Sequence, residues 1–133
     1  LRRAPEVWRD DVALMPVAEQ LAAYFARRLT RFTMPLDLRQ VTPFTARVLR
    51  ETRKVRFGRL TSYGALADRL GSPGASRAVG GALGRNPVPI IVPCHRVLAQ
   101  GGRLGGFTGG LTTKRLLLRV EGHQFPEPPP GLF

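Results

Sequence analysis

The sequence predicts a protein of the α/β (α+β) class, in which a small, truncated N-terminal lobe precedes a mostly helical domain. In several segments apolar residues recur at steps of three and four, which is typical of helices that pack one face on a core. Two short predicted helices are joined by the turn Ser72-Pro73-Gly74, an arrangement that resembles a helix-turn-helix. The apolar run from Val88 to Val92 favours one short buried strand.

Composition divides the chain into three stretches. Residues 1–40 are interpreted as a remnant N-terminal lobe, residues 41–123 as the main domain and residues 124–133 as a proline-rich tail. The lobe contains one predicted helix, which begins near residue 15. Its apolar residues are predicted to share one buried face: Val17, Leu21, Tyr24, Phe25 and Leu29.

Start and stop signals delimit the helices of the main domain. Thr42 followed by Pro43 is an N-cap with proline at the first helical position, which predicts a helix start. Thr61 and Ser62 give the cap of the next helix, and Gly71 gives its end. The predicted helices are residues 43–54, 63–70, 75–85 and 111–120.

The third of these helices carries an unusual set of small residues. At positions i, i+3, i+4 and i+7 one face consists of Arg77, Gly80, Gly81 and Gly84. The apolar Val79 and Leu83 lie on another face and are predicted to pack inward. Each interior glycine costs a helix about 1 kcal/mol relative to alanine. The glycines therefore indicate either close packing against another helix or a bulky ligand that approaches the backbone.

DNA is a ligand of that kind. The B-DNA minor groove is only ~6 Å wide, whereas a helix with side chains measures ~10–12 Å across. A face of glycines flanked by Ala78 and Ala82 would let this helix lie against the groove. Arg77 would then be the one long side chain that could enter the base stack and occupy the space of an extruded nucleotide.

The charge of the chain also indicates a polyanionic partner. The sequence has 21 Lys and Arg against 9 Asp and Glu, a net charge of +12, and nearly all of the cations are arginines. The guanidinium fork matches phosphate oxygens, so nucleic acid is the leading candidate. The alternative is an arginine-rich surface that serves solubility alone.

Cysteine and histidine content narrows the function classes. One cysteine excludes an internal disulfide and a cysteine-rich zinc site, and two histidines add little, so neither a metal nor a cofactor is predicted. No apolar run approaches the ~20 residues of a membrane helix. The expected protein is a monomer in a reducing, intracellular compartment, the cytoplasm.

Cys94 lies directly beside His95 and after the apolar run. A thiol at the end of a buried strand is a candidate nucleophile that faces a cleft, and the alternative is a small buried hydrophobic residue. Because a free thiol is mostly protonated near neutral pH, a neighbouring base must activate it. Adjacent side chains on a strand point to opposite faces, so His95 is expected to act through a bridging water, unless it is a structural histidine.

Several motifs together resemble the O6-alkylguanine-DNA alkyltransferase family over about residues 40–123. They are Arg77-Ala78-Val79-Gly80-Gly81-Ala82, Asn86-Pro87, Ile90-Ile91-Val92-Pro93-Cys94-His95-Arg96-Val97, Gly109-Gly110-Leu111 and Glu121-Gly122-His123. The resemblance implies a winged helix-turn-helix-like DNA-binding unit and a suicide methyltransferase for direct DNA repair. Such a protein binds double-stranded DNA from the minor groove, flips out O6-alkylguanine, and transfers the alkyl group stoichiometrically to its own cysteine. O4-alkylthymine is a further candidate substrate.

The resemblance also implies roles for individual residues. Cys94 would be the alkyl acceptor and His95 the base acting through a water. Glu121 would orient His95, and Asn86 would hold the turn that shapes the site. Phe107 stands where the family often has tyrosine, so it could wall the pocket without donating a hydrogen bond.

The remaining implied roles concern DNA. Tyr63 would press on the phosphate 3′ to the target, and Arg77 would fill the gap left in the duplex. The groove-facing side would include Ala78, Gly80, Gly81 and Ala82. The alkylguanine pocket would be formed by Pro89, Pro93, Val97, Phe107 and Thr108.

Three alternative functions stay open at this point. A non-catalytic alkyltransferase-like sensor of damaged bases would lack the acceptor cysteine that this chain has. A Cys-His hydrolase would need an oxyanion hole but no glycine-faced helix. A helix-turn-helix repressor would need polar, base-reading side chains on its second helix, and glycines supply none.

Overall fold

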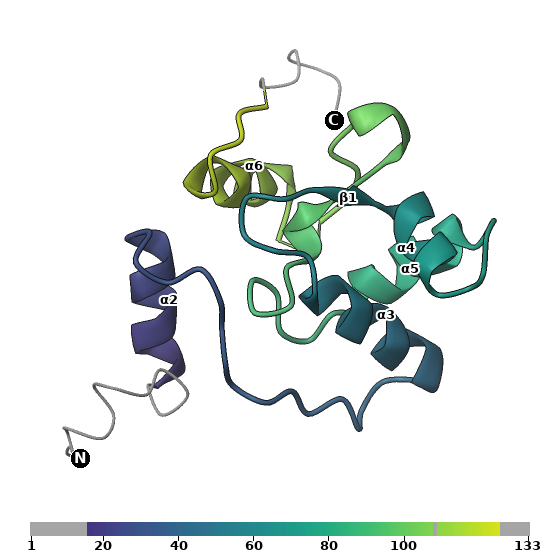
Figure 1. The fold of residues 1–133 in the computed structure, drawn as a ribbon, viewed down its shortest axis with the longest axis horizontal. Helices are drawn as coiled ribbons and strands as arrows, with labels where there is room; N and C mark the ends of the chain where they lie inside the picture. The colour runs from purple at the N-terminus through teal and green to yellow at the C-terminus, as the bar shows by residue number, and fades with distance from the viewer. Residues whose placement is uncertain (1–15, 108, 126–133) are drawn as a thin grey trace.

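The computed structural model describes residues 16–107 and 109–125 of the chain. Within them the mixed α+β class is confirmed (Figure 1). The α-helices of these described residues are α2 (Val17–Phe25), α3 (Pro43–Arg53), α4 (Tyr63–Arg69), α5 (Ser76–Gly84) and α6 (Leu111–Val120). The same part of the chain also contains the 3₁₀ turns η2 (Cys94–Arg96) and η3 (Gln100–Gly102) and the short strands β1 (Thr61–Ser62) and β2 (Val97–Leu98). In this part of the chain, no helix is long and apolar enough to span a bilayer.

The capping signals in the sequence place the helices α3 and α4. The Thr42 side chain accepts a hydrogen bond from the Thr45 amide at 3.1 Å. The Ser62 side chain accepts one from the Ala65 amide at 3.0 Å. Each cap satisfies an amide that would otherwise have no partner in the first turn, a contribution of about 1 kcal/mol. The predicted starts of both helices are confirmed, and each helix ends one residue before the predicted end.

Helices α3, α4 and α5 pack around one apolar core, and the turn that carries Cys94 belongs to the same core. The buried members of this cluster are Val48, Leu49, Leu66, Ala67, Val79, Ala82, Leu83, Val92, Cys94 and Val97. Full burial of a large aliphatic side chain stabilises the fold by about 1.5–3 kcal/mol. The thiol is thus held by the core that also fixes the helix pair α4 and α5.

The strand predicted for residues 88–92 is wrong. Ile90 has a φ of +77°, and the Val92 amide donates to the Val88 carbonyl at 3.0 Å, which closes a tight turn instead of an extended run. Pro87 and Pro89 lack the N–H groups that a strand ladder requires. Cys94 therefore begins a 3₁₀ turn and does not end a strand.

The sequence did not predict the parallel sheet that the strands β1 and β2 form. Thr61 pairs with Val97 and Ser62 with Leu98. Strands of two residues are too short to show a hydrophobic period, so no pattern could reveal them. The pairing places the first turn of α4 beside the segment that follows Cys94.

The N-terminal helix buries only part of the predicted face, since Leu21 and Leu29 pack, partly buried, against the cluster around Tyr24. Val17 is 47% exposed and Phe25 is 46% exposed, whereas Tyr24 is fully buried. The buried stripe of α2 runs through Gln20, Ala23 and Tyr24. The helix ends before Leu29 because Arg27, at a φ of +60°, turns the chain away. From there the chain runs without regular structure along the lower edge of Figure 1 to α3.

Candidate active site and DNA-facing helix

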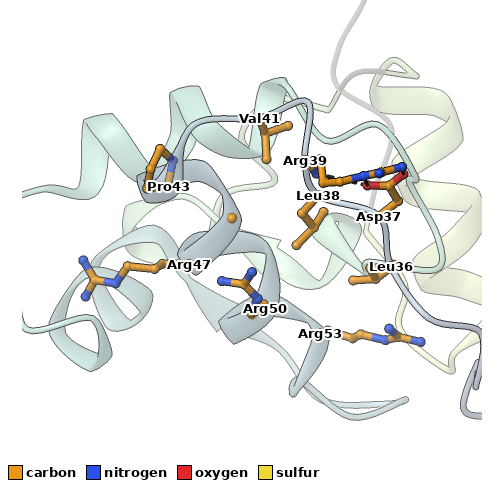
Figure 2. Close-up of a pocket in the computed structure, with 10 residues that line it drawn as sticks. Leu36, Asp37, Leu38, Arg39, Val41, Pro43, Arg47, Arg50 and Arg53 are labelled. Carbon is orange, nitrogen blue, oxygen red and sulfur yellow. Dashed lines mark hydrogen bonds and ion pairs between the residues drawn. The ribbon is translucent and has the colours of Figure 1, made fainter.

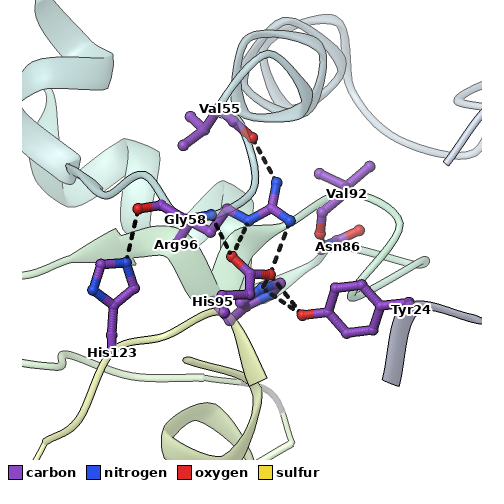
Figure 3. A network of polar contacts seen from close by, with 9 residues as sticks. Tyr24, Val55, Gly58, Asn86, Val92, His95, Arg96 and His123 are labelled. Carbon is purple, nitrogen blue, oxygen red and sulfur yellow. Dashed lines mark hydrogen bonds and ion pairs between the residues drawn. The ribbon is translucent and has the colours of Figure 1, made fainter. Parts of the chain in front are cut away.

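The buried carboxylate of Glu121, just after α6, joins side chains from distant parts of the chain (Figure 3). Its Oε2 lies 2.7 Å from His95 Nε2 and accepts a hydrogen bond from the Tyr24 hydroxyl at 2.6 Å. Arg96 donates to both carboxylate oxygens, from Nε at 2.7 Å and from Nη2 at 2.8 Å. The Gly58 amide donates to Oε1 at 3.2 Å. The predicted pairing of His95 with Glu121 is therefore present in the structure.

The protonation state of His95 follows from this arrangement. Burial alone would raise the pKa of Glu121, but hydrogen bonds from His95 and Arg96 outweigh it and lower that pKa to about 2. Since a carboxylate only accepts, Nε2 of His95 carries the proton and Nδ1 has the free lone pair. Burial lowers the pKa of His95, so the ring is neutral at pH 7. Among the described residues Nδ1 is buried without a hydrogen-bond partner, so it is the nitrogen able to take up a proton.

Cys94 lies in the core cluster with only 6% of its surface exposed. Burial raises the pKa of its thiol, while a hydrogen bond from Asn86 and the charge of Lys114 oppose that shift. The thiol is therefore protonated at neutral pH and needs a base before it can react. Asn86 Nδ2 lies 3.3 Å from Sγ and also donates to the Val92 carbonyl at 3.1 Å, so one amide both contacts the nucleophile and shapes the turn before it.

Lys114 is a buried residue of the site that the sequence interpretation left without a role. Its Nζ donates to the carbonyls of Val97 at 2.8 Å, Gly106 at 3.1 Å and Leu104. Burial lowers its pKa to about 8. The ammonium thus holds the loop between β2 and α6 through these carbonyls, and it places a positive charge near Cys94.

A cavity of about 300 Å³ connects the thiol to α5. It is lined by Tyr63, Gly80, Leu83, Gly84, Cys94, Gly106 and Phe107. Of these, Tyr63, Gly80, Cys94 and Phe107 were predicted as site residues, and Gly84 was predicted as part of the glycine face. Because the exposed Gly84 of α5 belongs to the lining, the cavity reaches the glycine face of that helix.

Three residues expected in this pocket are not part of its lining. Pro89 is exposed on the turn after Asn86, and Pro93 is buried and lines a different groove. Val97 is fully buried, and its carbonyl already accepts from Lys114. Their assignment to the alkylguanine pocket came from the resemblance, and it stays a prediction. Thr108 lies outside the described residues.

The glycines of α5 do not serve packing against another helix. A methyl group at Gly80 would meet only the Tyr63 ring, at 4.0 Å, and one at Gly81 would meet only the Arg85 guanidinium, at 3.7 Å. At Gly84 it would meet no described atom within 4 Å. All of these are ordinary or open contacts. The packing explanation is therefore wrong for the fold itself, and an external ligand is the explanation that remains.

Most predicted members of the DNA-facing side are accessible, with one exception. Arg77, Ala78 and Gly81 are exposed on α5, and Gly80 is partly buried. Ala82 is fully buried in the core beside Val79, so its assignment to the DNA-facing side is wrong. The error arose because Ala82 flanks the glycines in sequence but lies on the inner stripe of the helix.

The sequence interpretation missed Tyr24, Arg96 and Lys114. Lys114 was detectable, since it lies in the apolar stripe of α6 with Leu117 and Leu118, where a charge is costly unless it is bonded. Tyr24 gave no signal beyond being aromatic on an apolar face. In the described part of the chain no three His, Cys, Asp or Glu side chains gather where they could hold a metal ion.

Comparison with known proteins finds relatives of this chain that are named for a reaction on DNA. The family model described as 6-O-methylguanine DNA methyltransferase, DNA binding domain, matches residues 43–123. The methylated-DNA–protein-cysteine methyltransferase of Mycobacterium tuberculosis (strain H37Rv) is 48% identical over 117 residues, which are 88% of this chain and 70% of that protein. The protein of the same name from Salmonella typhimurium is 44% identical over 107 residues, 80% of this chain and 63% of that protein.

A solved structure also shows the similarity to this family. The crystal structure of Mycobacterium tuberculosis OGT in complex with DNA superposes with a TM-score of 0.75 at 51% identity. The alignment covers 78% of this chain and 63% of the solved chain. This chain thus spans about two thirds of the length of the relatives it matches.

Removal of the Tyr24 hydroxyl tests whether its hydrogen bond stabilises the buried carboxylate of Glu121. The pKa of Glu121 is about 2 instead of its ordinary 4.5, so the carboxylate stabilises the fold above pH 4.5, and this contribution is lost as the pH falls towards 2. Tyr24→Phe removes one hydrogen bond that lowers this pKa. We expect the acid-unfolding midpoint, followed by circular dichroism, to move to higher pH, and the free energy of unfolding at pH 7 to fall by about 1–2 kcal/mol.

Tyr63→Phe is the matched control, because its hydroxyl bonds Gly106 and not Glu121. It should leave the acid midpoint unchanged. The same midpoint for Tyr24→Phe and Tyr63→Phe would show that the Tyr24 hydroxyl does not stabilise the carboxylate.

Proposed function

The chain belongs to the O6-methylguanine DNA methyltransferase family, and on that premise we propose that it repairs alkylated DNA by transferring an alkyl group from O6 of guanine to Cys94. The observation that supports this most is the cavity that joins the Cys94 thiol to the exposed glycine face of α5. A nucleophile placed there can be reached by a base only if that base leaves the duplex. The proposed ligand is double-stranded DNA approached from the minor groove.

The chemistry requires a soft nucleophile at a saturated carbon. His95 Nδ1 takes the thiol proton through a water, and the ionised Glu121 stabilises the imidazolium that results. The thiolate forms the carbon–sulfur bond as the carbon–oxygen bond breaks, and the proton ends on the released guanine. Burial that raises the pKa of Cys94 keeps the thiol protonated until a substrate is present. The product is a thioether, so the protein reacts once.

The DNA-facing residues have separate proposed roles. Tyr63 lies at the start of α4 with its ring beside Gly80, where it can press on the phosphate next to the target. Arg77 is exposed on α5 and fills the gap that the extruded base leaves. Phe107 forms an apolar wall of the cavity. The contacts are mainly with phosphate and sugar, so binding falls steeply with salt and depends little on sequence.

The organisation of the chain is part of the proposal. Residues 41–123 provide DNA binding and chemistry, and residues 1–40 contribute the helix that carries Tyr24. The protein acts as a monomer. A reducing intracellular compartment, the cytoplasm, suits a reaction that depends on one free thiol.

Stoichiometry is the first test. Incubation with excess duplex containing O6-methylguanine should add one CH₂ mass to the peptide that contains Cys94, and transfer should stop at one group per protein. A thioether cannot be displaced by water or by thiol exchange, which acts on disulfides. Cys94→Ala should bind the duplex and transfer nothing. Repeated turnover would indicate a true catalyst, and tight binding by the unaltered protein without transfer would indicate the damaged-base sensor.

Arg77→Ala tests base extrusion. We expect transfer from duplex DNA to slow by about tenfold, as expected for the loss of one interaction of about 1.4 kcal/mol, while transfer from a free O6-alkylguanine base changes little. The control is Arg119→Ala, an exposed arginine on α6. An equal loss on both substrates would remove Arg77 from this role.

Gly81→Ala separates folding from binding. A methyl group there meets ordinary contacts in the free protein, so the helix propensity of alanine should raise the free energy of unfolding by about 0.5–1 kcal/mol. The same methyl group would stand between α5 and the groove, so DNA affinity should fall. A more stable variant with unchanged affinity in a fluorescence anisotropy titration would place DNA elsewhere.

A further inference from the structure

The surface along α3 and the segment before it carries a strong positive charge that the proposed active site does not use. Residues 31–56 contain seven Lys and Arg and two Asp and Glu, so they supply +5 of the net charge of +12. We call these cations the basic band: Arg31, Arg39, Arg47, Arg50, Arg53, Lys54 and Arg56.

Two grooves make the basic band continuous. The first is lined by Arg39, Arg47, Arg50 and Arg53, with Asp37 and apolar residues of the segment before α3 (Figure 2). The second is lined by Arg31, Arg50, Arg53, Lys54 and Arg56. Arg50 and Arg53 line both grooves, so the cations face one connected surface.

The fold neutralises little of this charge. Asp37 is paired with Arg39 at 2.7 Å, and Glu51 is shared between Lys54 at 3.2 Å and Arg69 at 3.4 Å. These are the only two carboxylates between residues 31 and 56. The other arginines of the band form no ion pair with the described residues.

Two of those arginines are held in place by backbone carbonyls. Arg47 donates to the Leu70 carbonyl at 2.8 Å, and Arg53 donates to the Met34 carbonyl at 2.6 Å. Burial lowers the pKa of Arg53, and the neighbouring charge of Arg31 lowers it further. A surface that holds like charges in position without counter-charges is suited to an anionic partner.

The basic band lies on α3 and the glycine face lies on α5, and the two point away from each other across the core that these helices share. Helix α3 buries Val48 and Leu49 in the core that it shares with α5, so its exposed arginines point away from that helix. Helix α5 buries Val79 and Leu83 in the same core and exposes Arg77. Packed helices have axes about 8–10 Å apart. A straight duplex on the glycine face is therefore separated from the band by the thickness of two helices.

We propose that the basic band binds the phosphate backbone of a second DNA segment, so that one molecule bridges two duplexes. Helix α3 rises 1.5 Å per residue, so Arg47 to Arg53 spans about 9 Å, the axial length of about three phosphates on one strand. The contact is with the backbone alone and is independent of sequence and of damage. The inference rests on the proposed function only in taking α5 as the first DNA-binding face.

Energy transfer between two unmodified short duplexes, one with a donor dye and one with an acceptor dye, tests the bridge. The unaltered protein should bring the dyes together at low salt, and Arg50→Glu should reduce the signal at least fivefold. Arg50 is suitable because it lines both grooves and makes no hydrogen bond with the described residues. Arg50→Gln should give an intermediate loss and shows the effect without a reversed charge.

Arg119→Glu is the matched control, because it makes the same change in net charge at an exposed position of α6, a helix that lies away from α3 in Figure 1. It should keep the signal within twofold, and both variants should transfer methyl groups from a saturating short duplex at the unaltered rate. If the unaltered protein binds one duplex and gives no energy transfer, or if Arg50→Glu and Arg119→Glu lose it equally, the bridge is refuted and the repair function stands. Absence of both DNA binding and methyl transfer would instead refute the proposed function.

Discussion

The hydrogen-bonded carboxylate of Glu121 is the interaction on which the site depends. A buried charge is tolerated only when it is paired and its lone pairs are bonded, and here His95, Arg96, Tyr24 and Gly58 provide those bonds. Loss of a partner from a buried ion pair typically costs about 3–5 kcal/mol, because a charge is left without compensation. The same carboxylate fixes the tautomer of His95. The carboxylate of Glu121 therefore affects both the stability of the fold and the nitrogen of His95 that is able to accept a proton.

The walls of the cavity differ in how firmly the surrounding residues hold them. The thiol side is fixed by core packing and by the Asn86 amide, and the loop opposite is fixed by Lys114 through three carbonyl oxygens. The α5 side, by contrast, presents glycines that make few contacts of their own. The site thus combines a firmly held thiol with a helix face that carries few side chains. The bare face comes from the three glycines of α5, each of which lowers the helix propensity of that segment.

Local signals predicted local structure well, and long-range contacts remained hidden. The caps at Thr42 and Ser62 fixed two helix starts, because a cap depends on residues three positions apart. The apolar run before Cys94 was misinterpreted, since hydrophobicity cannot reveal that two prolines prevent pairing. The resemblance supplied the pairing of His95 with Glu121. It supplied nothing about Tyr24, whose hydroxyl meets a carboxylate 97 positions away, where no periodicity applies.

That separation has a kinetic meaning. A contact that closes a loop of 97 residues carries a large loop-closure entropy and forms only when most of the chain is already ordered. The hydrogen bond from Tyr24 is therefore expected to complete the network around Glu121 late in folding, whereas the contact of His95 with Glu121 spans only 26 positions. For a protein that is consumed by one reaction, late assembly has a clear benefit. An incompletely folded chain holds a thiol of ordinary reactivity, and we expect the irreversible step to become fast only once Tyr24 has reached Glu121 and completed the network that holds His95.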